Sequence, residues 1–297
     1  MDKSEARVRK LASRYRIENG KHFRLKDIDP ADTAHIDDPD LAKVMLERGV
    51  KRLSDLQEKL YAQDRWALLL VFQAMDAAGK DGTIKHVMSG VNPQGVQVTS
   101  FKAPGPEALA HDFLQRCVLA LPERGRIGIF NRSHYEEVLV VRVHPEILER
   151  EHLPRELLGK KLWEHRMDAI VAFERHLSWQ GTVVLKFFLH VSKAEQKRRF
   201  LERLEEKDKH WKFSASDLTE REFWDDYQHA YQEAIAATAA PEAPWFIVPA
   251  DNKWFTRVIV VEAMIEALEA LDLRIPAPTE AEEAALEAAR RKLESEA

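Results

Sequence analysis

The sequence predicts a three-layer α/β domain with a five-stranded, mainly parallel sheet. A continuous apolar run at residues 67–72 is typical of a strand that is buried on both faces of a parallel sheet. From there to residue 271, strand-like and helix-like segments alternate along the chain. Such alternation is typical of parallel strands joined by helices that cover both faces of one sheet. The 297 residues suffice for a sizeable core and contain no internal repeat.

The same patterns locate the individual elements. Short apolar or β-branched runs predict strands at 67–72, 96–101, 126–130, 182–189 and 245–248. Apolar residues at helical spacing predict helices at 41–63, 84–88, 106–121, 154–179, 193–206, 217–237 and 254–271. We therefore expect an N-terminal segment and helix at 1–63, one α/β domain at 64–275, and a charged tail helix at 276–297.

Composition limits the class of protein. Hydrophobic residues make up 45% and charged residues 32% of the chain, as in soluble globular proteins. The sequence contains neither a run of ~20 apolar residues nor the apolar core of a signal peptide, so we expect no membrane partner and a cytoplasmic location. The single cysteine, Cys117, stands at four-residue spacing from Phe113 and Leu121 and is expected in the core. Because the net charge is −5, we expect no nucleic-acid partner, and any polyanion site must be a local cluster of cations.

A loop of small residues follows the first strand and leads into a helix. A strand, such a loop with Gly-Lys, and a helix together direct backbone N–H groups and a helix N-terminus at phosphates. The pattern G-x-x-x-x-G-K-[ST] is incomplete, because Ala74 and Asp81 replace its first glycine and its hydroxyl residue. An ordinary turn into a surface helix is the alternative. We predict a phosphate-binding loop that contains Ala77, Ala78, Gly79, Lys80, Asp81 and Gly82.

Charged side chains in this loop suit phosphoryl transfer. Lys80 would neutralise charge on the phosphoryl group as it moves. A carboxylate beside phosphates repels them unless a cation intervenes, so Asp76 suggests magnesium binding or proton abstraction from an acceptor. The alternative is that Asp76 caps the following helix. For Asp81, capping and the helix dipole are a sufficient explanation, and a role at the phosphates stays open.

A second group of polar residues follows the third predicted strand. Arg132 can donate to two phosphate oxygens at once, and the alternative is that it pairs with a nearby carboxylate. Asn131 stands where many phosphate-loop enzymes carry an Asp that binds magnesium. Of Glu136 and Glu137, we expect one to contact a metal and the other to be a solvated helix face. His134 is expected either to touch the substrate or to be a structural hydrogen-bonding group.

A basic segment follows the fourth predicted strand. Gln196, Arg199 and Arg203 fall at three- and four-residue spacing, so one helix face would present two guanidinium groups in line. This arrangement suits a lid at about 193–225 that closes over phosphates. The alternative is a solvated face on which the cations pair with acidic neighbours. Because the carboxyl ends of parallel strands share one edge of a sheet, we expect all three groups of residues to converge.

Five motifs together resemble the polyphosphate kinase 2 family. They are Gln73-Ala-Met-Asp-Ala-Ala-Gly-Lys-Asp-Gly82, Phe130-Asn-Arg-Ser-His-Tyr-Glu136, Lys186-Phe-Phe-Leu189, Trp211-Lys-Phe213 and Ala243-Pro-Trp245. They occur in the order that the family has, between about residues 20 and 275. The run Val-Leu-Val-Val-Arg-Val after the second motif is similar to the third class of the family, which phosphorylates nucleoside monophosphates and diphosphates.

The resemblance implies a P-loop kinase fold like that of thymidylate kinase. It implies inorganic polyphosphate as donor, AMP or ADP as acceptor, Mg²⁺ or Mn²⁺ as cofactor, and a homodimer or homotetramer. The residues assigned to catalysis are Asp76, Lys80 and Arg132, and those assigned to the nucleotide are Asn131, Arg132, His134 and Glu137. Besides the loop, phosphate binding is assigned to Arg198, Arg199, Arg203 and Lys212. Relatives have Asp at the position of Asn131, so magnesium would depend on Asp76 and Glu137.

Two other functions remain open from the sequence. An ATP-dependent nucleotide kinase of the thymidylate kinase type would need one or two lid arginines, whereas a long basic surface suits a chain of phosphates. A non-catalytic polyanion-binding protein could keep the same fold. The combination of Asp76, Lys80 and Arg132 argues against that second alternative.

Overall fold

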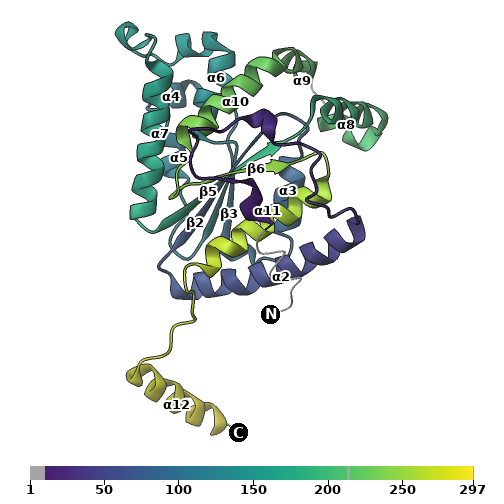
Figure 1. Cartoon of the computed structure of the whole chain (residues 1–297). Helices are drawn as coiled ribbons and strands as arrows, with labels where there is room; N and C mark the ends of the chain where they lie inside the picture. The colour runs from purple at the N-terminus through teal and green to yellow at the C-terminus, as the bar shows by residue number, and fades with distance from the viewer. Residues whose placement is uncertain (1–10, 213–214, 297) are drawn as a thin grey trace.

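The computed structural model describes residues 11–212 and 215–296, apart from the side chains of residues 209, 211, 212, 215 and 216. Its centre is a six-stranded sheet in the order β1-β6-β5-β2-β4-β3 (Figure 1). The strands are β1 Arg16–Ile17, β2 Ala67–Ala74, β3 Val96–Ser100, β4 Ile127–Asn131, β5 Thr182–His190 and β6 Trp245–Pro249. The five predicted strands are confirmed, and they pair in parallel. The prediction missed β1, which pairs antiparallel with β6 and has only two residues, too few to show an alternating pattern.

Strand β2 lies in the middle of the sheet, between β4 and β5. All its residues are buried, as the apolar run predicted. After β2 the chain adds β3 and β4 on one side, and then returns to add β5 and β6 on the other side. The direction of the crossovers therefore reverses beside β2. In sheets of this kind, the crevice for ligands lies outside the carboxyl ends of the strands at such a reversal.

Helices cover both faces of the sheet and complete the three layers (Figure 1). On one face, α11 (Lys253–Glu269) packs against α2 (Pro39–Gln63) and α3 (Lys80–Val87). On the other face, α10 (Trp224–Thr238) packs against α6 (Val140–Val143) and α7 (Leu162–Trp179). The core between them is apolar and includes Cys117, which is buried as predicted.

Three predicted helices are interrupted. The segment 106–121 forms α4 (Pro106–Leu109) and α5 (Gln115–Leu119), because the side chain of Asp112 accepts a hydrogen bond from the N–H of Leu114 and favours a turn between them. The predicted helix at 154–179 forms η6 (Arg155–Leu157) followed by α7. The predicted helix at 217–237 forms α9 (Ala215–Glu220) and η8 (Arg221–Phe223), followed by α10. The helix α8 (Lys193–Glu205) forms as predicted. Short 3-10 turns complete the elements: η1 Ala12–Tyr15, η2 Leu25–Asp27, η3 Pro93–Gly95, η4 His134–Val138, η5 Pro145–Arg150 and η7 Lys207–Lys212.

The predicted tail helix forms as α12 (Glu280–Glu294), which Figure 1 shows beyond the main body of the molecule. Every residue of this helix is exposed. It begins with a capping box, in which the side chains of Thr279 and Glu282 each bond to the other residue's backbone N–H. Local interactions at its N-terminus therefore stabilise α12, because none of its residues is buried against the rest of the protein. Among the described residues, no helix combines the length and the apolar character needed to cross a bilayer.

Candidate active site

The loop between β2 and α3 has the geometry of an anion-binding turn. Gly79 is the N-cap of α3 and has φ = 99°, a left-handed conformation that suits glycine. Ala77 is also left-handed (φ = 59°), which for a non-glycine residue costs on the order of 1–2 kcal/mol. The first N–H groups of a helix have no partner within the helix, and here they face the end of the loop. A phosphate at this position would meet both these donors and the positive end of the helix dipole.

Lys80 lies across this loop. Its Nζ donates a hydrogen bond to the carbonyl oxygen of Ala74 at 3.2 Å, at the end of β2. Burial lowers the pKa of Lys80, and the nearby guanidinium of Arg132 lowers it further, whereas the carboxylates of Asp76, Glu136 and Asp81 act in the opposite direction. The ammonium group is thus kept in a partly desolvated position. A positive charge interacts more strongly with a phosphate there than it would in water.

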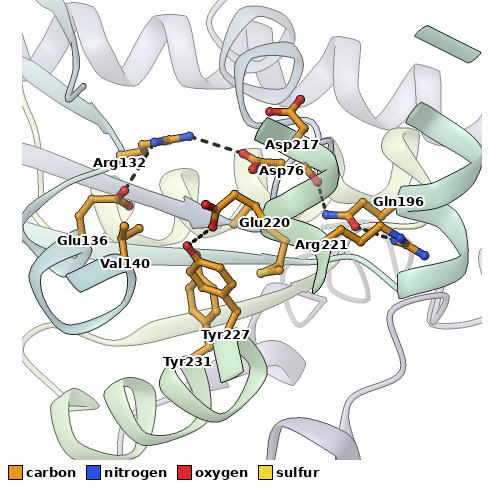
Figure 2. Close-up of a pocket in the computed structure, with 12 residues that line it drawn as sticks. Asp76, Arg132, Glu136, Val140, Gln196, Asp217, Glu220, Arg221, Tyr227 and Tyr231 are labelled. Atoms are coloured by element: carbon orange, nitrogen blue, oxygen red, sulfur yellow. Dashed lines mark hydrogen bonds and ion pairs between the residues drawn. The ribbon is translucent and has the colours of Figure 1, made fainter. Parts of the chain in front are cut away.

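Arg132 comes from the end of β4 and points toward the same loop. Its Nη2 lies 3.5 Å from Oδ1 of Asp76, and its Nη1 lies 3.6 Å from Oε2 of Glu136 (Figure 2). The backbone of Arg132 is left-handed, with φ = 63°. Strained backbone of this kind persists where surrounding contacts fix it, and it is frequent at functional sites. Asp76, Lys80 and Arg132 therefore converge at the carboxyl edge of the sheet, beside the point where the crossovers reverse.

A cavity of about 240 Å³ opens at this edge (Figure 2). Its polar lining includes four carboxyl groups and two guanidinium groups, those of Asp76, Glu136, Asp217, Glu220, Arg132 and Arg221. Tyr227 and Tyr231, one helical turn apart on α10, form part of another wall. Burial raises the pKa of Glu136, although Arg132 and Lys80 oppose the change. Because carboxyl groups outnumber guanidinium groups in this lining, a bound cation would favour the entry of a polyanion.

Sequence reasoning did not predict the contributions of Asp217, Glu220, Arg221 and the two tyrosines. They belong to segments that come late in the chain and that reach the cavity beside the end of β2 only in the folded protein. The one signal in the sequence was the spacing of Tyr227 and Tyr231, which places both on one face of a helix. That spacing is equally typical of an ordinary core face.

Glu137 and His134, both predicted to be nucleotide-binding, are not among the residues that line the cavity. Glu137 is buried and lies 3.4 Å from Nη1 of Arg166, which also donates to the Glu137 carbonyl at 3.0 Å. His134 is buried with its Nε2 3.4 Å from Oε1 of Glu174. The structure thus gives both residues internal partners, and the nucleotide-binding roles predicted for them stay predictions. It places the neighbouring Glu136, rather than Glu137, in the cavity.

Glu137 offers a test of this placement through pH. Burial and the carboxylate of Glu151 raise the pKa of Glu137 to about 7, although Arg166 acts against the change. The folded protein therefore holds a proton that the unfolded chain releases, and stability falls as the pH rises from the usual pKa of 4.5 toward 7. We expect Glu137→Gln to be more stable than wild type at pH 8, by up to about 3 kcal/mol, and to show little gain at pH 4. Urea unfolding at both pH values measures this difference, and an equal effect at both would contradict the assignment.

A fully buried ion pair stabilises the segment that carries Arg132. Nζ of Lys186 on β5 donates to Glu174 at 2.6 Å, to the Tyr135 hydroxyl at 3.0 Å and to the Thr238 carbonyl at 2.7 Å. All three ammonium donors are therefore satisfied. Tyr135 follows Arg132 by three residues, so the network connects this segment to β5, α7 and α10. This contact explains the lysine in the Lys186–Leu189 motif as a structural residue.

Asn131 contacts the phosphate loop directly. Its Nδ2 donates a hydrogen bond of 2.6 Å to Oδ1 of Asp81, in the first turn of α3. Asp81 therefore has a partner besides the helix N-terminus. An Asp at position 131 would have no hydrogen to donate, and two carboxylates would then face each other.

We expect Asn131→Asp to fold, because the carboxylate has the size of the amide, but to depend more strongly on divalent cations. The melting temperature should be lower than that of wild type without magnesium and should recover when magnesium is added, because a cation between two carboxylates removes their repulsion. The control is the exchanged pair Asn131→Asp/Asp81→Asn, which restores one donor and one acceptor and should lose this dependence. A collapse of the melting temperature with and without magnesium would instead identify Asn131 as a structural residue.

The cations of α8 differ in their surroundings. Arg198 is exposed and pairs with Glu195 and Glu202, as the alternative of a salt-bridged face predicted. Arg203 is half-buried and lies 3.7 Å from Asp217, a cavity residue. Arg199 is buried and contacts backbone carbonyl groups, so the structure gives it no free donor for a phosphate chain. The side chain of Lys212 lies outside the described residues.

No group of three or more His, Cys, Asp or Glu side chains is arranged to hold a metal ion, as far as the described part of the chain shows. A complete protein cage is not needed for Mg²⁺, which proteins usually bind through one or two carboxylates together with substrate phosphates. Asp76 is partly exposed in the cavity, and Glu136 lies on the other side of Arg132. Asp76 is therefore a carboxylate that could share a magnesium ion with substrate phosphates, whereas the Arg132 guanidinium separates it from Glu136.

Comparison with known proteins gives consistent matches. The family model described as Polyphosphate kinase 2 (PPK2) matches residues 37–276. An ADP-polyphosphate phosphotransferase from Rhodopseudomonas palustris is 55% identical over 238 residues, covering 80% of this chain and 82% of that protein. An AMP/ADP-polyphosphate phosphotransferase from Meiothermus ruber is 44% identical over 271 residues, covering 91% and 97%. The crystal structure of Polyphosphate Kinase 2 from Arthrobacter aurescens TC1 has a TM-score of 0.85 and 41% identity, covering 93% of this chain and 96% of that one.

Proposed function

Because the chain belongs to the polyphosphate kinase 2 family, we propose that it transfers the terminal phosphoryl group of inorganic polyphosphate to AMP and ADP. The products are ADP and ATP, and a polyphosphate chain shorter by one phosphate. The observation that carries this proposal is the convergence of Asp76, Lys80 and Arg132 beside an anion-binding loop. The names of the two relatives, one with ADP and one with AMP/ADP, support both acceptors.

Lys80 and the loop are proposed to bind the phosphoryl group that moves. At neutral pH its three oxygens carry negative charge that spreads during transfer. The ammonium group of Lys80 and the first N–H groups of α3 are donors at fixed positions, so they require no reorganisation as that charge moves. Since the Lys80 ammonium already contacts the end of β2, its position is determined before substrate arrives.

Arg132 is proposed to orient the phosphate acceptor. Its two terminal nitrogens face Asp76 and Glu136 at 3.5 and 3.6 Å, which are long contacts for ion pairs. Phosphate oxygens can replace these weak contacts with two parallel hydrogen bonds to one guanidinium. The attacking oxygen then lies in a fixed orientation toward the donor chain, which lowers the entropic cost of the reaction.

Asp76 is proposed to hold the magnesium ion together with the phosphates of the substrates. The attacking oxygen of AMP or ADP belongs to a phosphate that is largely deprotonated at pH 7, so the acceptor needs no general base. This favours cation binding over proton abstraction as the role of Asp76. When bound, magnesium neutralises phosphate charge and so allows a polyanion into an acidic cavity.

The direct test is incubation of the purified chain with polyphosphate, magnesium and AMP or ADP, without ATP. We expect ADP and ATP to form from AMP, and chelation of the metal to abolish the reaction. Replacing polyphosphate with ATP tests the alternative donor. The polyphosphate proposal is overturned if the incubation with polyphosphate forms neither ADP nor ATP while the incubation with ATP phosphorylates AMP. That result would favour an ATP-dependent kinase. Light scattering on the same preparation tests the homodimer or homotetramer that the family resemblance implies.

A further inference from the structure

The guanidinium group of Arg199 is completely occupied by contacts within the protein. Its Nε donates to Oε1 of Glu195 at 2.7 Å. Its Nη1 donates to the carbonyls of Ala77 and Ala78 at 3.0 and 2.9 Å, and its Nη2 to those of Ala250 and Asp251 at 2.6 and 3.1 Å. An arginine has five N–H donors, and all five are matched. The residue is 3% exposed, so a phosphate chain cannot reach it without breaking these contacts.

A second residue of α8 makes the same kind of contact. Gln196 precedes Arg199 by one helical turn, and its Nε2 donates to the carbonyl of Asp76 at 2.9 Å. Three consecutive carbonyl groups of the phosphate loop, those of Asp76, Ala77 and Ala78, are therefore bound by α8. Arg221 donates to Oε1 of Gln196 at 2.7 Å, which fixes the orientation of its amide (Figure 2).

These contacts determine which way the loop donors point. In a trans peptide the C=O and the following N–H point in opposite directions. Since Arg199 binds the carbonyl of Ala78, the N–H of Gly79 points away from α8. The Ala77 carbonyl, which belongs to a residue in a strained left-handed conformation, is fixed by the same group. A buried positive charge behind these peptide groups also strengthens their attraction for an anion in front of them.

We propose that Arg199, supported by Gln196, is a positioning residue of the phosphate loop. It acts through the peptide groups of residues 76–79 and touches neither substrate. The N-terminal half of α8 is therefore a fixed wall behind the loop, and only residues beyond it can move as a lid. This inference rests on the proposed function, because its kinetic test requires turnover. A second test requires only that the loop binds phosphate.

The kinetic test compares three variants of the full chain at two salt concentrations. Lysine keeps the charge but has one nitrogen, which cannot reach acceptors in three segments. We expect Arg199→Lys to lower kcat by about 100-fold, with the salt dependence of KM for polyphosphate unchanged. Arg203→Ala, in contrast, should mainly raise that KM and reduce its salt dependence, because a direct phosphate contact is lost. The control is Lys197→Ala, an exposed cation on the same helix that contacts no loop carbonyl and should leave kcat unchanged.

Two further measurements separate positioning from general damage to the fold. Guanidinium ion at millimolar concentration should restore part of the kcat of Arg199→Ala, because the buried acceptors remain, and should not accelerate wild type. Gln196→Ala should lower kcat by about 10-fold at an unchanged melting temperature. A positioning role and general destabilisation therefore predict different results. A variant that is merely unstable would lose activity in step with the decrease in its melting temperature, and guanidinium ion would not rescue it.

Calorimetric titration with tripolyphosphate tests the inference independently of turnover. We expect Arg199→Lys to bind this probe at least 10-fold more weakly than wild type, even if polyphosphate proves not to be the donor. The proposal is overturned if Arg199→Lys keeps near-normal kcat and binding while Arg199→Ala reduces the salt dependence, because that pattern identifies a direct phosphate contact. It is also overturned if neither Arg199 variant affects binding of the probe.

Discussion

We expect Lys80→Ala to lower kcat by about 10³-fold and to leave the fold intact. The expected loss is large because the ammonium group is a preorganised charge in a desolvated position, and removing one such donor from a catalytic site typically costs 10²–10³-fold. The fold should tolerate the change, since within the described part of the chain Nζ makes one hydrogen bond, to a carbonyl at the edge of the cavity. Steady-state kinetics with polyphosphate and AMP, together with thermal unfolding, measure both expectations.

The matched control for this variant is Lys85→Ala. Lys85 is in the same helix, α3, and is exposed, so its removal changes the net charge equally without touching the loop. It should keep near-normal kcat. Lys80→Arg should recover little activity, because a planar guanidinium cannot occupy the position of a compact ammonium group. Turnover of Lys80→Ala within 10-fold of wild type would refute the role assigned to this residue.

Asp76→Asn should lower kcat by about 100-fold and weaken the dependence of the rate on magnesium. The amide has the size of the carboxylate but is a much poorer ligand for a hard cation. It also removes one of the two carboxylates beside Arg132, so KM for the acceptor should rise less than kcat falls. Rates measured over a range of acceptor concentrations, at several magnesium concentrations, give kcat, KM for the acceptor and the dependence on magnesium.

Asp55→Asn on the exposed surface of α2 is the control for Asp76→Asn, because it makes the same chemical change far from the cavity. Manganese gives a second comparison, since it also prefers oxygen ligands. If Asp76→Asn keeps the magnesium dependence of wild type while losing activity, Asp76 acts by orienting Arg132 rather than by holding the metal.

The sequence predicted the sheet well because burial on both faces leaves a direct mark on composition. The strand at 67–72 is apolar throughout, and the structure confirms it as the start of β2. β1 left no such mark, because a two-residue edge strand depends on its pairing with β6. The break between α4 and α5 depends on one side chain, Asp112, that prefers a turn to a helix. Hydrophobic spacing does not show such local competition.

The candidate site was predictable where residues directly follow strands. Asp76, Lys80 and Arg132 meet because β2 and β4 are neighbours and end at the same edge. Side-chain direction was not predictable in the same way. Glu136 and Glu137 differ by one position, and only the path of η4 decides which one faces the cavity. For Arg199, helical spacing gave the correct face of α8, but it could not show that this face packs against the loop and not against solvent.

The acidic lining of the cavity has a consequence for how the protein responds to its surroundings. Four carboxyl groups against two guanidinium groups repel a bare polyanion but accept one whose charge is already compensated. Polyphosphate and nucleotides themselves compete for divalent cations, so an excess of either depletes the compensated form. With the metal requirement proposed above, we expect turnover to follow the ratio of divalent cation to total phosphate, rather than the concentration of either one. A cell that accumulates phosphate polymer without matching cation would thereby slow its use through this protein, with no separate regulatory site.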